Sequence, residues 1–360
     1  MPDLQMSEFP AALRAPMMVE SSVLPLPPPQ AGAARVSVVV VVWNAQKYVL
    51  ECLQSLRQHC EKICSEVIVV DNASSDGTPE LVAERFPEFK LIRNRENLGF
   101  AKANNIGIAE SSGDYICLVN SDVKFLDDCI SPMLRYLAEH PGVAMLGPKM
   151  LGANGEVRRS TMRFPTVWNN FCRAIGIDSL FKRSRLFGGM MMSDFDHRTT
   201  GPVEVLNGWF LVVRRHAIAR VGLLDPQFFM YGEDVDWCYR FHLAGEPVVF
   251  FAEAGAVHYG GASSANAPVR FYLELYRATW QYWRKHRGGP ARLGFLAAFA
   301  IHHAIRLVAS GLIYLFSPSR RTRTAARFER SLACLQWVGA APFRQFDGGK
   351  KTAPTRAIAS

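Results

Sequence analysis

The sequence predicts an α/β fold in which a doubly wound, mostly parallel sheet carries flanking helices, with an amphipathic helical region near the C-terminal end. Strand-like apolar runs alternate with helical periodicity from Val36 to residue 146, and this alternation is typical of parallel sheets covered by helices. Of the 360 residues, 49% are hydrophobic and 20% are charged. This composition is ordinary for a globular protein and excludes a collagen-like, coiled-coil or wholly disordered chain.

The first half of the chain gives the clearest pattern. Its first expected strand, Val36–Val42, is a nearly continuous run of valines of the kind that fills buried parallel strands. Four further strands are expected at 67–70, 89–92, 115–119 and 143–146. Helical patterns follow the first four strands, at 48–56, 81–86, 100–109 and 130–137.

The pattern loosens between residues 149 and 202, where seven basic residues and one acid lie between Arg158 and Arg185. We expect this segment to be a basic excursion on the surface. Order is expected to resume with a strand at 203–213 and a helix that opens at the acidic cluster 232–236. A strand at 248–251 and a helix at 271–286 follow.

Residues 1–35 hold seven of the 21 prolines and show no apolar periodicity. They also lack a basic stretch followed by an apolar one, so we expect a disordered leader rather than a signal peptide. The predicted organisation is this leader, a folded domain at 36–290, a membrane-associating helix at 291–317 and a basic tail at 318–360. Eight cysteines without a C-x-x-C pair indicate reduced thiols and hence a cytosolic chain.

The segment 293–316 is mostly apolar and long enough to span a bilayer. However, four polar residues fall on one helical stripe, and an Arg at the bilayer centre costs about 2.5–3.5 kcal/mol on insertion scales. These residues are His302, His303, Arg306 and Ser310. The stripe and the basic flanks favour a helix that lies in the membrane interface. A spanning helix and a helical hairpin packed on the domain are the alternatives.

The tail at 318–360 has nine Lys/Arg against Glu329 and Asp347, a net charge of +7. A basic tail of this kind meets either an anionic membrane or nucleic acid. The stretch 320–330 lacks interleaved aromatic residues apart from Phe328, and the apolar helix precedes it. These observations favour the membrane over nucleic acid.

Polar residues follow the second expected strand, from Asp71 to Thr78. Ligands in open α/β sheets bind beyond the carboxyl ends of the strands, so Asp71 is placed to accept hydrogen bonds from a base N–H or a ribose hydroxyl. Alternatively, Asp76 and its neighbours supply only a turn and the cap of the next helix. These residues alone leave both interpretations open.

The fourth expected strand ends in Asn120-Ser121-Asp122. A carboxylate in this place suits Mg²⁺ or Mn²⁺ that shares its ligands with substrate phosphates, although a turn or a helix cap is the simpler interpretation of Asp122 alone. In the Asn-rich segment 97–107, Gly99 permits a helix start with N–H groups aimed at phosphate, and Lys102 adds positive charge. An ordinary helix cap is again the alternative.

Three carboxylates, those of Glu233, Asp234 and Asp236, lie within four positions. Close and partly buried carboxylates raise one another's pKa values, which suits a general base for a hydroxyl nucleophile. An acidic first turn that complements the helix dipole is the alternative, but the surrounding aromatic residues favour a buried cluster. Downstream, His258 follows a strand and is a further candidate metal ligand.

Taken together, these motifs resemble the inverting family 2 glycosyltransferases, which have a GT-A fold, and within them the bacterial rhamnosyltransferase-like branch. The resemblance covers residues 36–286 and rests on 38–44, 70–78, 97–107, 120–122, 232–236 and His258. It implies transfer of a sugar such as L-rhamnose from a nucleoside-diphosphate sugar. The apolar helix at 293–316, the +7 tail and the basic segment at 158–185 lead us to expect an acceptor hydroxyl on a glycan or a polyprenyl-diphosphate-linked glycan in cell-envelope polysaccharide synthesis, at the cytoplasmic face of the inner membrane.

The resemblance also implies roles for the residues that match its motifs. Asp234 would be the catalytic base beside Glu233, and Asp122 would be the last Asp of a DXD-type motif that holds Mg²⁺ or Mn²⁺ together with His258. Asp71 would contact the donor base. The other donor-side residues would be Asn44, Asp76, Asn97, Gly99, Lys102 and Asn120. The acceptor side would hold Gly208, Trp209 and Asp236.

Two departures from the family pattern matter. Asn120 stands where the motif has its first Asp, so metal binding would rest on Asp122 and His258. No Gln-x-x-Arg-Trp motif follows, which argues for the addition of one or a few sugars rather than processive synthesis.

Two alternative functions remain at this point. A sugar-nucleotide nucleotidyltransferase would carry a G-x-G-x-R loop after the first strand, where this chain reads Trp43-Asn44-Ala45-Gln46. A non-catalytic nucleotide- or membrane-binding module is disfavoured by the complete motif around Asp234.

Overall fold

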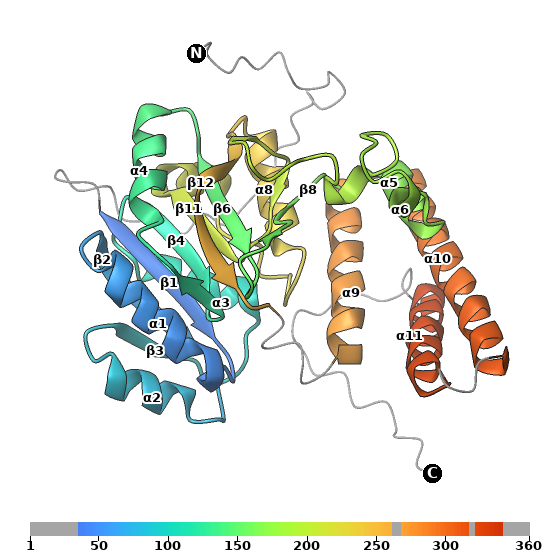
Figure 1. Ribbon diagram of the computed structural model, residues 1–360, viewed down its shortest axis with the longest axis horizontal. Helices are drawn as coiled ribbons and strands as arrows, with labels where there is room; N and C mark the ends of the chain where they lie inside the picture. The colour runs from blue at the N-terminus through green and yellow to red at the C-terminus, as the bar shows by residue number, and fades with distance from the viewer. Residues whose placement is uncertain (1–34, 261–267, 317–320, 341–360) are drawn as a thin grey trace.

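The computed structural model describes residues 35–260, 268–316 and 321–340 (Figure 1). The predictions for residues 1–34 of the leader and for 341–360 of the basic tail lie outside these ranges.

The described residues form one ten-stranded sheet with the central order β3-β2-β1-β4-β11-β6-β12-β5. β7 pairs with β6, β9 pairs with β12, and β8 pairs with β10 in a separate two-stranded sheet. The first six strands are β1 (Val36–Val42), β2 (Cys64–Asp71), β3 (Lys90–Arg93), β4 (Tyr115–Asn120), β5 (Val123–Phe125) and β6 (Met145–Leu151). The others are β7 (Val157–Arg158), β8 (Thr161–Met162), β9 (Gly201–Pro202), β10 (Val205–Leu206), β11 (Phe210–Arg214) and β12 (Val248–His258).

The N-terminal half of the sheet is parallel, since β1 pairs in parallel with β2 and β4, and β2 with β3. β11 runs antiparallel to β4 and β6. The register sets Val42 beside Asp71 and Val41 beside Asn120. The polar residues at the ends of β2 and β4 therefore lie at the same edge of the sheet, as the sequence predicted.

Helices cover both faces of the sheet, which confirms the doubly wound fold. Along β1, Val38 and Val40 face one apolar cluster, whereas Val39 faces the other. The first cluster is closed by α1 (Gln46–Cys60) and α4 (Ile130–Glu139). The second is closed by α3 (Phe100–Ala109), α7 (Arg215–Val221) and α8 (Glu233–Leu243). α2 (Thr78–Arg85) lies beside β3 and α1. All eight cysteines are free thiols, and seven of them are buried.

The expected single strand at 203–213 is wrong. Its first part is β10, which pairs with β8, and its second part is β11 in the main sheet. Between them, the Trp209 N–H donates to the Asn207 carbonyl in a tight turn, and the Gly208 N–H donates to the Asp234 carboxylate. Because of these contacts, residues 207–209 are not in a strand, and they line the large cavity of the candidate site.

The basic excursion at 158–185 is also more ordered than expected. It contains α5 (Val167–Ala174) and α6 (Ile177–Leu180), and a short 3₁₀ helix, η3 (Gly189–Met191), follows it. The Thr166 hydroxyl accepts a hydrogen bond from the Asn169 N–H, and the Asn169 side chain accepts one from the Thr166 N–H, so a capping box starts α5. α5 packs against the C-terminal helices (Figure 1).

Three long helices follow the sheet: α9 (Pro268–His286), α10 (Gly289–Phe316) and α11 (Arg321–Ala340). α9 stands between the sheet and α10, and α10 packs against α5 and α11 (Figure 1). Part of the segment predicted as a basic tail is therefore a helix packed on its neighbour.

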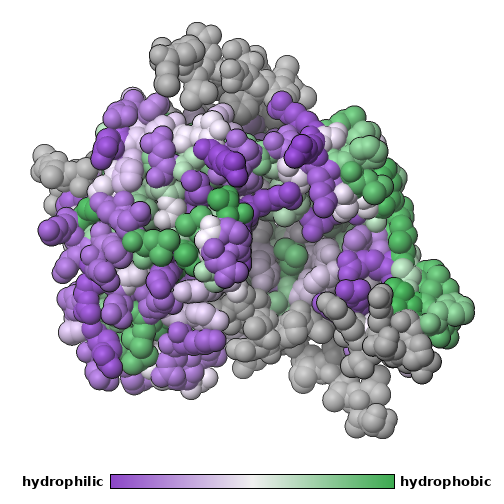
Figure 2. Space-filling model, viewed as in Figure 1, coloured by the Kyte–Doolittle hydropathy of each residue, from purple (hydrophilic) through white to green (hydrophobic). Residues whose placement is uncertain are grey.

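The polar stripe of α10 is only partly turned inward, because Arg306 is exposed. His303 and Ser310 are buried among the helices, whereas Ile305, Val308 and Leu312 are exposed. The apolar surface of α10 is visible along the right edge of Figure 2. Among the described residues, α10 is the one helix whose length and hydropathy are sufficient to cross a membrane.

Candidate active site

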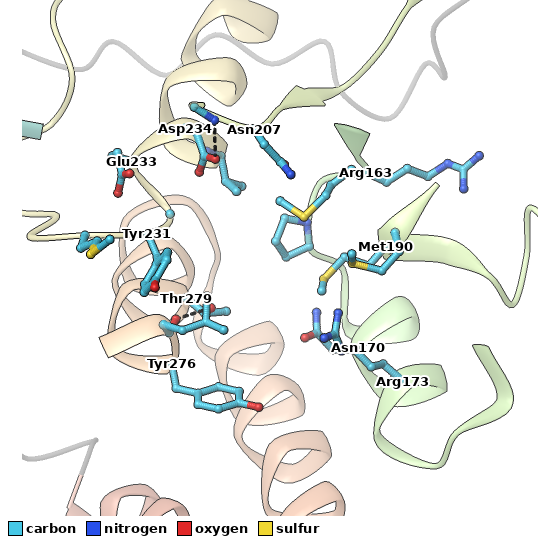
Figure 3. Close-up of a pocket in the computed structure, with 18 of the residues that line it drawn as sticks. Arg163, Asn170, Arg173, Met190, Asn207, Tyr231, Glu233, Asp234, Tyr276 and Thr279 are labelled. Carbon is cyan, nitrogen blue, oxygen red and sulfur yellow. Dashed lines mark hydrogen bonds between the residues drawn. The ribbon is translucent and has the colours of Figure 1, made fainter. Parts of the chain in front are cut away.

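Two cavities lie at the carboxyl edge of the strands and share the side chains of Phe100, Asn120 and Met230. The larger, of about 440 Å³, reaches from the start of α8 to α5, α9 and α10 (Figure 3). The smaller, of about 90 Å³, lies over the ends of β1, β2 and β4. We call them the large cavity and the small cavity.

Hydrogen bonds join the loop after β2 to the loop after β1. The Asn44 N–H donates to the Ser74 hydroxyl at 2.9 Å, and the Ser75 N–H donates to the Asn44 side-chain oxygen at 2.8 Å. Asn44 has φ of 47°, a left-handed conformation that Asn tolerates better than most residues. Asn44 thus shapes the loop but does not line either cavity.

Asp76 holds the starts of two helices. Its carboxylate accepts hydrogen bonds from the Gln46 N–H, the Thr78 N–H and the Thr78 hydroxyl. Both carboxylate oxygens are therefore engaged, and Asp76 acts as the turn and cap that the sequence offered as its alternative role. Lys102, on α3, lines neither cavity.

Asp71 is buried at the end of β2. One of its carboxylate oxygens accepts the Ser74 N–H at 3.2 Å, and the other is buried without a hydrogen-bond partner among the described residues. A buried acceptor without a partner is costly, so an atom in this position is suited to a ligand that donates a hydrogen bond.

Gly99 closes the small cavity at the start of α3. Its φ is 85°, and a Cβ atom there would lie 2.4 Å from the Phe229 carbonyl oxygen. That carbonyl accepts the Phe100 N–H at 2.7 Å, and the Asn97 side chain accepts the Gly99 N–H at 3.0 Å. No side chain larger than glycine's fits this position, because the loop before α8 lies directly on it.

Asp122 and His258 lie together, as predicted, with Asp122 Oδ1 3.1 Å from His258 Nε2. The His258 ring stacks on Trp209, with ring centroids 5.4 Å apart. The Asn120 side-chain oxygen beside them is buried and has no hydrogen-bond partner among the described residues. Within the described residues, no three His, Cys, Asp or Glu side chains gather as a complete metal site. The carboxylate, imidazole and amide fit a divalent cation that takes its remaining ligands from a substrate.

Asp234 lies in the first turn of α8 with its carboxylate facing the large cavity (Figure 3). Its Oδ2 accepts the Gly208 N–H at 3.1 Å, and its Oδ1 accepts the Val235 N–H at 2.8 Å. Glu233 also lines this cavity, and its Oε2 is buried without a hydrogen-bond partner among the described residues. Gly208 thus serves the site through its backbone N–H, which orients the Asp234 carboxylate.

Burial raises the pKa of Asp234, although the N–H donors of Gly208 and Val235 oppose that shift. Burial, together with the charge of Asp234, raises the pKa of Glu233 well above its ordinary value. A carboxylate with a raised pKa is a stronger base once it is ionised, which suits proton removal from a hydroxyl group.

Asp236 was expected on the acceptor side, and this expectation is wrong. Its side chain is fully buried and lines neither cavity. The carboxylate contacts Arg240 at 2.9 Å, Lys285 at 2.8 Å and His286 at 2.6 Å. Asp236 therefore joins α8 to the end of α9 and has a structural role.

The far wall of the large cavity was not found from the sequence. It comes from the end of β8, from α5, α9 and α10 and from the segment around η3, which are remote from the motifs along the chain. Its residues include Met162, Arg163, Asn170, Arg173, Met190, Met191, Tyr276, Thr279, Phe295, Ala298, Phe299 and His302. The run Met190-Met191-Met192 is the signal that marks this wall in the sequence, since Met is frequent at adaptable binding surfaces.

Comparison with known proteins gives a consistent result. N-acetylglucosaminyl-diphospho-decaprenol L-rhamnosyltransferase of Mycobacterium tuberculosis (strain ATCC 25618 / H37Rv) is 28% identical over 263 residues, which cover 70% of this chain and 85% of the relative. The putative glycosyltransferase EpsH of Bacillus subtilis (strain 168) is 36% identical over 105 residues, which cover 28% of this chain and 29% of the relative.

Among solved structures, a mannosyltransferase from Pyrobaculum calidifontis in complex with GDP-Man and Mn²⁺ is similar in fold. It has a TM-score of 0.50 and 18% identity, and the match covers 87% of this chain and 90% of that one. The family model "Glycosyl transferase family 2" matches residues 37–196. The strands β1 to β4 and the loops after them thus lie in a segment that is similar to the family 2 glycosyltransferases, and the fold is similar to that of a solved glycosyltransferase.

Proposed function

We propose that this protein is an inverting glycosyltransferase of cell-envelope polysaccharide synthesis. It transfers a sugar from a nucleoside-diphosphate sugar to a hydroxyl group of a lipid-linked glycan. The observation that carries the proposal is the placement of the Asp234 carboxylate. It faces the large cavity and is oriented by the Gly208 N–H. Asn120, Trp209 and His258 line the same cavity. A single displacement at the anomeric carbon requires a base on the acceptor side of that carbon and a site for the departing diphosphate on the opposite side.

In the proposed reaction, Asp234 removes the proton from an acceptor hydroxyl while its oxygen attacks the anomeric carbon. The bond between that carbon and the diphosphate oxygen breaks, and the electron pair leaves with the nucleoside diphosphate. Attack from the opposite face inverts the anomeric configuration, so no covalent enzyme intermediate forms. Glu233 is buried beside Asp234, and its raised pKa favours the neutral form, so the negative charge of the pair lies on Asp234.

On the donor side, Asp122 and His258 would hold Mg²⁺ or Mn²⁺, with Asn120 as a further ligand. Such an ion offsets negative charge on the departing diphosphate. Asp71 has a buried oxygen without a partner among the described residues, and we assign it to a hydrogen-bond donor of the nucleoside. Asn97 and Gly99 shape the small cavity, and Asn44 and Asp76 hold the loops that frame the same edge. Lys102 lines neither cavity, so we assign it no direct contact with the donor.

The choice of substrates follows the relative from M. tuberculosis, whose name specifies L-rhamnose and a diphospho-decaprenol acceptor. We propose L-rhamnose as the sugar and a polyprenyl-diphosphate-linked glycan as the acceptor. A lipid-linked acceptor agrees with the exposed apolar face of α10, and we place the protein at the cytoplasmic face of the inner membrane.

A donor screen tests the proposed function. Purified protein is incubated with dTDP-, UDP- or GDP-sugars and a lipid-linked acceptor, and the released nucleoside diphosphate and the glycosylated product are measured. One donor should yield a product of inverted anomeric configuration by NMR. Release of pyrophosphate from a nucleoside triphosphate and a sugar phosphate would instead identify a nucleotidyltransferase. Retention of configuration would contradict the role of Asp234.

A further inference from the structure

The large cavity has more room and a less polar lining than a sugar ring requires. At about 440 Å³ it lies in the range of about 300–1,000 Å³ that is typical of pockets for drug-sized ligands. Its apolar lining includes methionines, Leu275 of α9 and three residues of α10. These residues are Met150, Met162, Met190, Met191, Met230, Leu275, Phe295, Ala298 and Phe299.

Polar groups line both ends of this cavity and part of the wall between them. Asp234, Glu233 and Asn207 lie at one end, and Asn170 and Arg173 of α5 lie at the other (Figure 3). A ligand that fills the cavity must therefore offer hydroxyl groups at the α8 end and both an anion and an apolar chain near α5 and α10.

Arg173 is the cation suited to that anion. Arg163, the other arginine of the lining, forms a salt bridge with Asp194 at 2.6 Å. Arg173 is exposed and forms no salt bridge with the described residues. Its side chain is therefore available to a phosphate group, for which arginine has matching hydrogen-bond geometry.

α10 connects this cavity with the outer apolar surface. Phe295, Ala298 and Phe299 form the cavity wall, and Ile305, Val308 and Leu312 are exposed further along the same helix. A chain that leaves the cavity along α10 meets an apolar surface rather than water. An apolar surface that continues from a cavity to the outside is expected at a binding site for a lipid and not at one for a soluble oligosaccharide.

We infer that the large cavity binds the isoprenoid-diphosphate end of the acceptor. The first isoprene units would lie against Leu275, Ala298 and Phe299, the diphosphate would lie at Arg173, and the acceptor sugar would lie at Asp234. This inference rests on the proposed function and names the part of the protein that recognises the lipid. Arg173 and Ala298 are thereby specificity residues for the acceptor.

Binding of farnesyl diphosphate, measured by calorimetry without any donor, tests the inference. This short isoprenoid diphosphate is soluble, and inorganic pyrophosphate supplies the same anion without the chain. The parent protein should bind farnesyl diphosphate at least ten-fold more tightly than pyrophosphate. Equal affinity for the two ligands would mean that a phosphate site alone is present and would overturn the inference.

Paired variants locate the site. Arg173→Ala should weaken farnesyl diphosphate binding at least five-fold, whereas Arg183→Ala, on an exposed arginine outside the cavity, should not. Ala298→Phe fills the cavity and should weaken binding at least ten-fold. Ala309→Phe, at an exposed position further along the same helix and outside the cavity, is its control. Equal effects of a variant and its control would contradict the assignment.

A third variant guards against misfolding of Ala298→Phe. Leu275 is 41% exposed and lines the cavity, whereas Leu243 is 38% exposed and does not. Leu275→Glu should weaken binding and Leu243→Glu should leave it unchanged, with thermal unfolding measured for both. Because binding is measured without sugar transfer, a parent that binds farnesyl diphosphate but transfers no sugar would contradict only the proposed function.

Discussion

Asp234 is buried and accepts two backbone N–H hydrogen bonds, and both conditions act on its pKa. The ionisation of Asp234 should therefore be visible in the pH dependence of the reaction. Burial raises its pKa above the ordinary value of 3.8, although the donors oppose the shift. A base must be unprotonated to accept a proton, so kcat/KM should rise with pH as Asp234 ionises, with the rise displaced above pH 3.8. A pH profile of kcat/KM checks this, and a rise centred below pH 3.8 would contradict the role of burial.

Substitution of Asp234 isolates its basicity from its shape. Asp234→Asn should lower turnover by roughly 10²–10⁴-fold, because the amide keeps the shape and cannot accept the proton. Donor affinity, measured by titration calorimetry, should be nearly unchanged. Glu233→Gln is the comparison, since near-normal turnover in Asp234→Asn together with loss in Glu233→Gln would move the base to Glu233.

At the donor edge, Asp122 and His258 lie in contact, and we expect both to contribute to metal-dependent binding of the donor. Asp122→Ala should weaken donor binding in Mg²⁺ or Mn²⁺ buffer, and this difference should vanish in excess chelator. Asp128→Ala, a carboxylate that lines neither cavity, is the control. Full activity of the parent protein in excess EDTA would show that the diphosphate is stabilised without a metal.

At the scale of elements, Asp236 fixes α9 on α8, and its ionisation stabilises the fold. Burial alone would raise the pKa of Asp236, but the hydrogen bond from His286 and the charges of Arg240 and Lys285 lower it well below its ordinary value of 3.8. A lowered pKa in the folded state stabilises the protein above pH 3.8, and that stabilisation is lost progressively as the pH falls further.

Asp236→Asn should therefore lower the free energy of unfolding by about 3–5 kcal/mol near pH 7, because it leaves Arg240 and His286 buried without their carboxylate. Urea unfolding followed by circular dichroism measures this loss. Glu253→Gln, on an exposed carboxylate, should change stability little. The difference between parent and Asp236→Asn should shrink below pH 3.8, and a difference independent of pH would contradict the ionic role.

The same elements show which parts of the fold and the site can be predicted from the sequence alone. The strands and helices up to β6, except for the short strand β5, follow from local periodicity, and the polar ends of the parallel strands converge because such strands align their carboxyl edges. Asp236 was misassigned because its partners Lys285 and His286 lie about 50 residues further along the chain. The break at Asn207–Trp209 and the wall made by α5 and α10 likewise depend on tertiary contacts, which no local pattern encodes.

At the scale of the whole molecule, α10 presents an apolar surface outward and buries His303 and Ser310 of its polar stripe. The protein should therefore bind vesicles of anionic lipid, with each Lys or Arg near the surface contributing about 1 kcal/mol that high salt removes. The double variant Val308→Asp/Leu312→Asp should abolish the fraction that salt does not release. Leu126→Asp, at an exposed leucine far along the chain, should not.

Vesicle co-sedimentation at low and high salt measures both contributions. A parent protein that carbonate does not extract would indicate a helix that spans the membrane. A parent protein that stays in the supernatant at low salt would leave α10 as part of a soluble helical hairpin.

The burial of the cysteines has a practical consequence for such measurements. Seven of the eight thiols are buried, and burial raises the pKa of the eighth, Cys64, to about 12, so few of the native thiols are in the reactive thiolate form near pH 7. A single cysteine introduced on the outer face of α10, as in Val308→Cys, would then react with maleimide dyes far faster than the native thiols. An environment-sensitive dye attached there would report the depth of α10 in a bilayer without removal of any native cysteine.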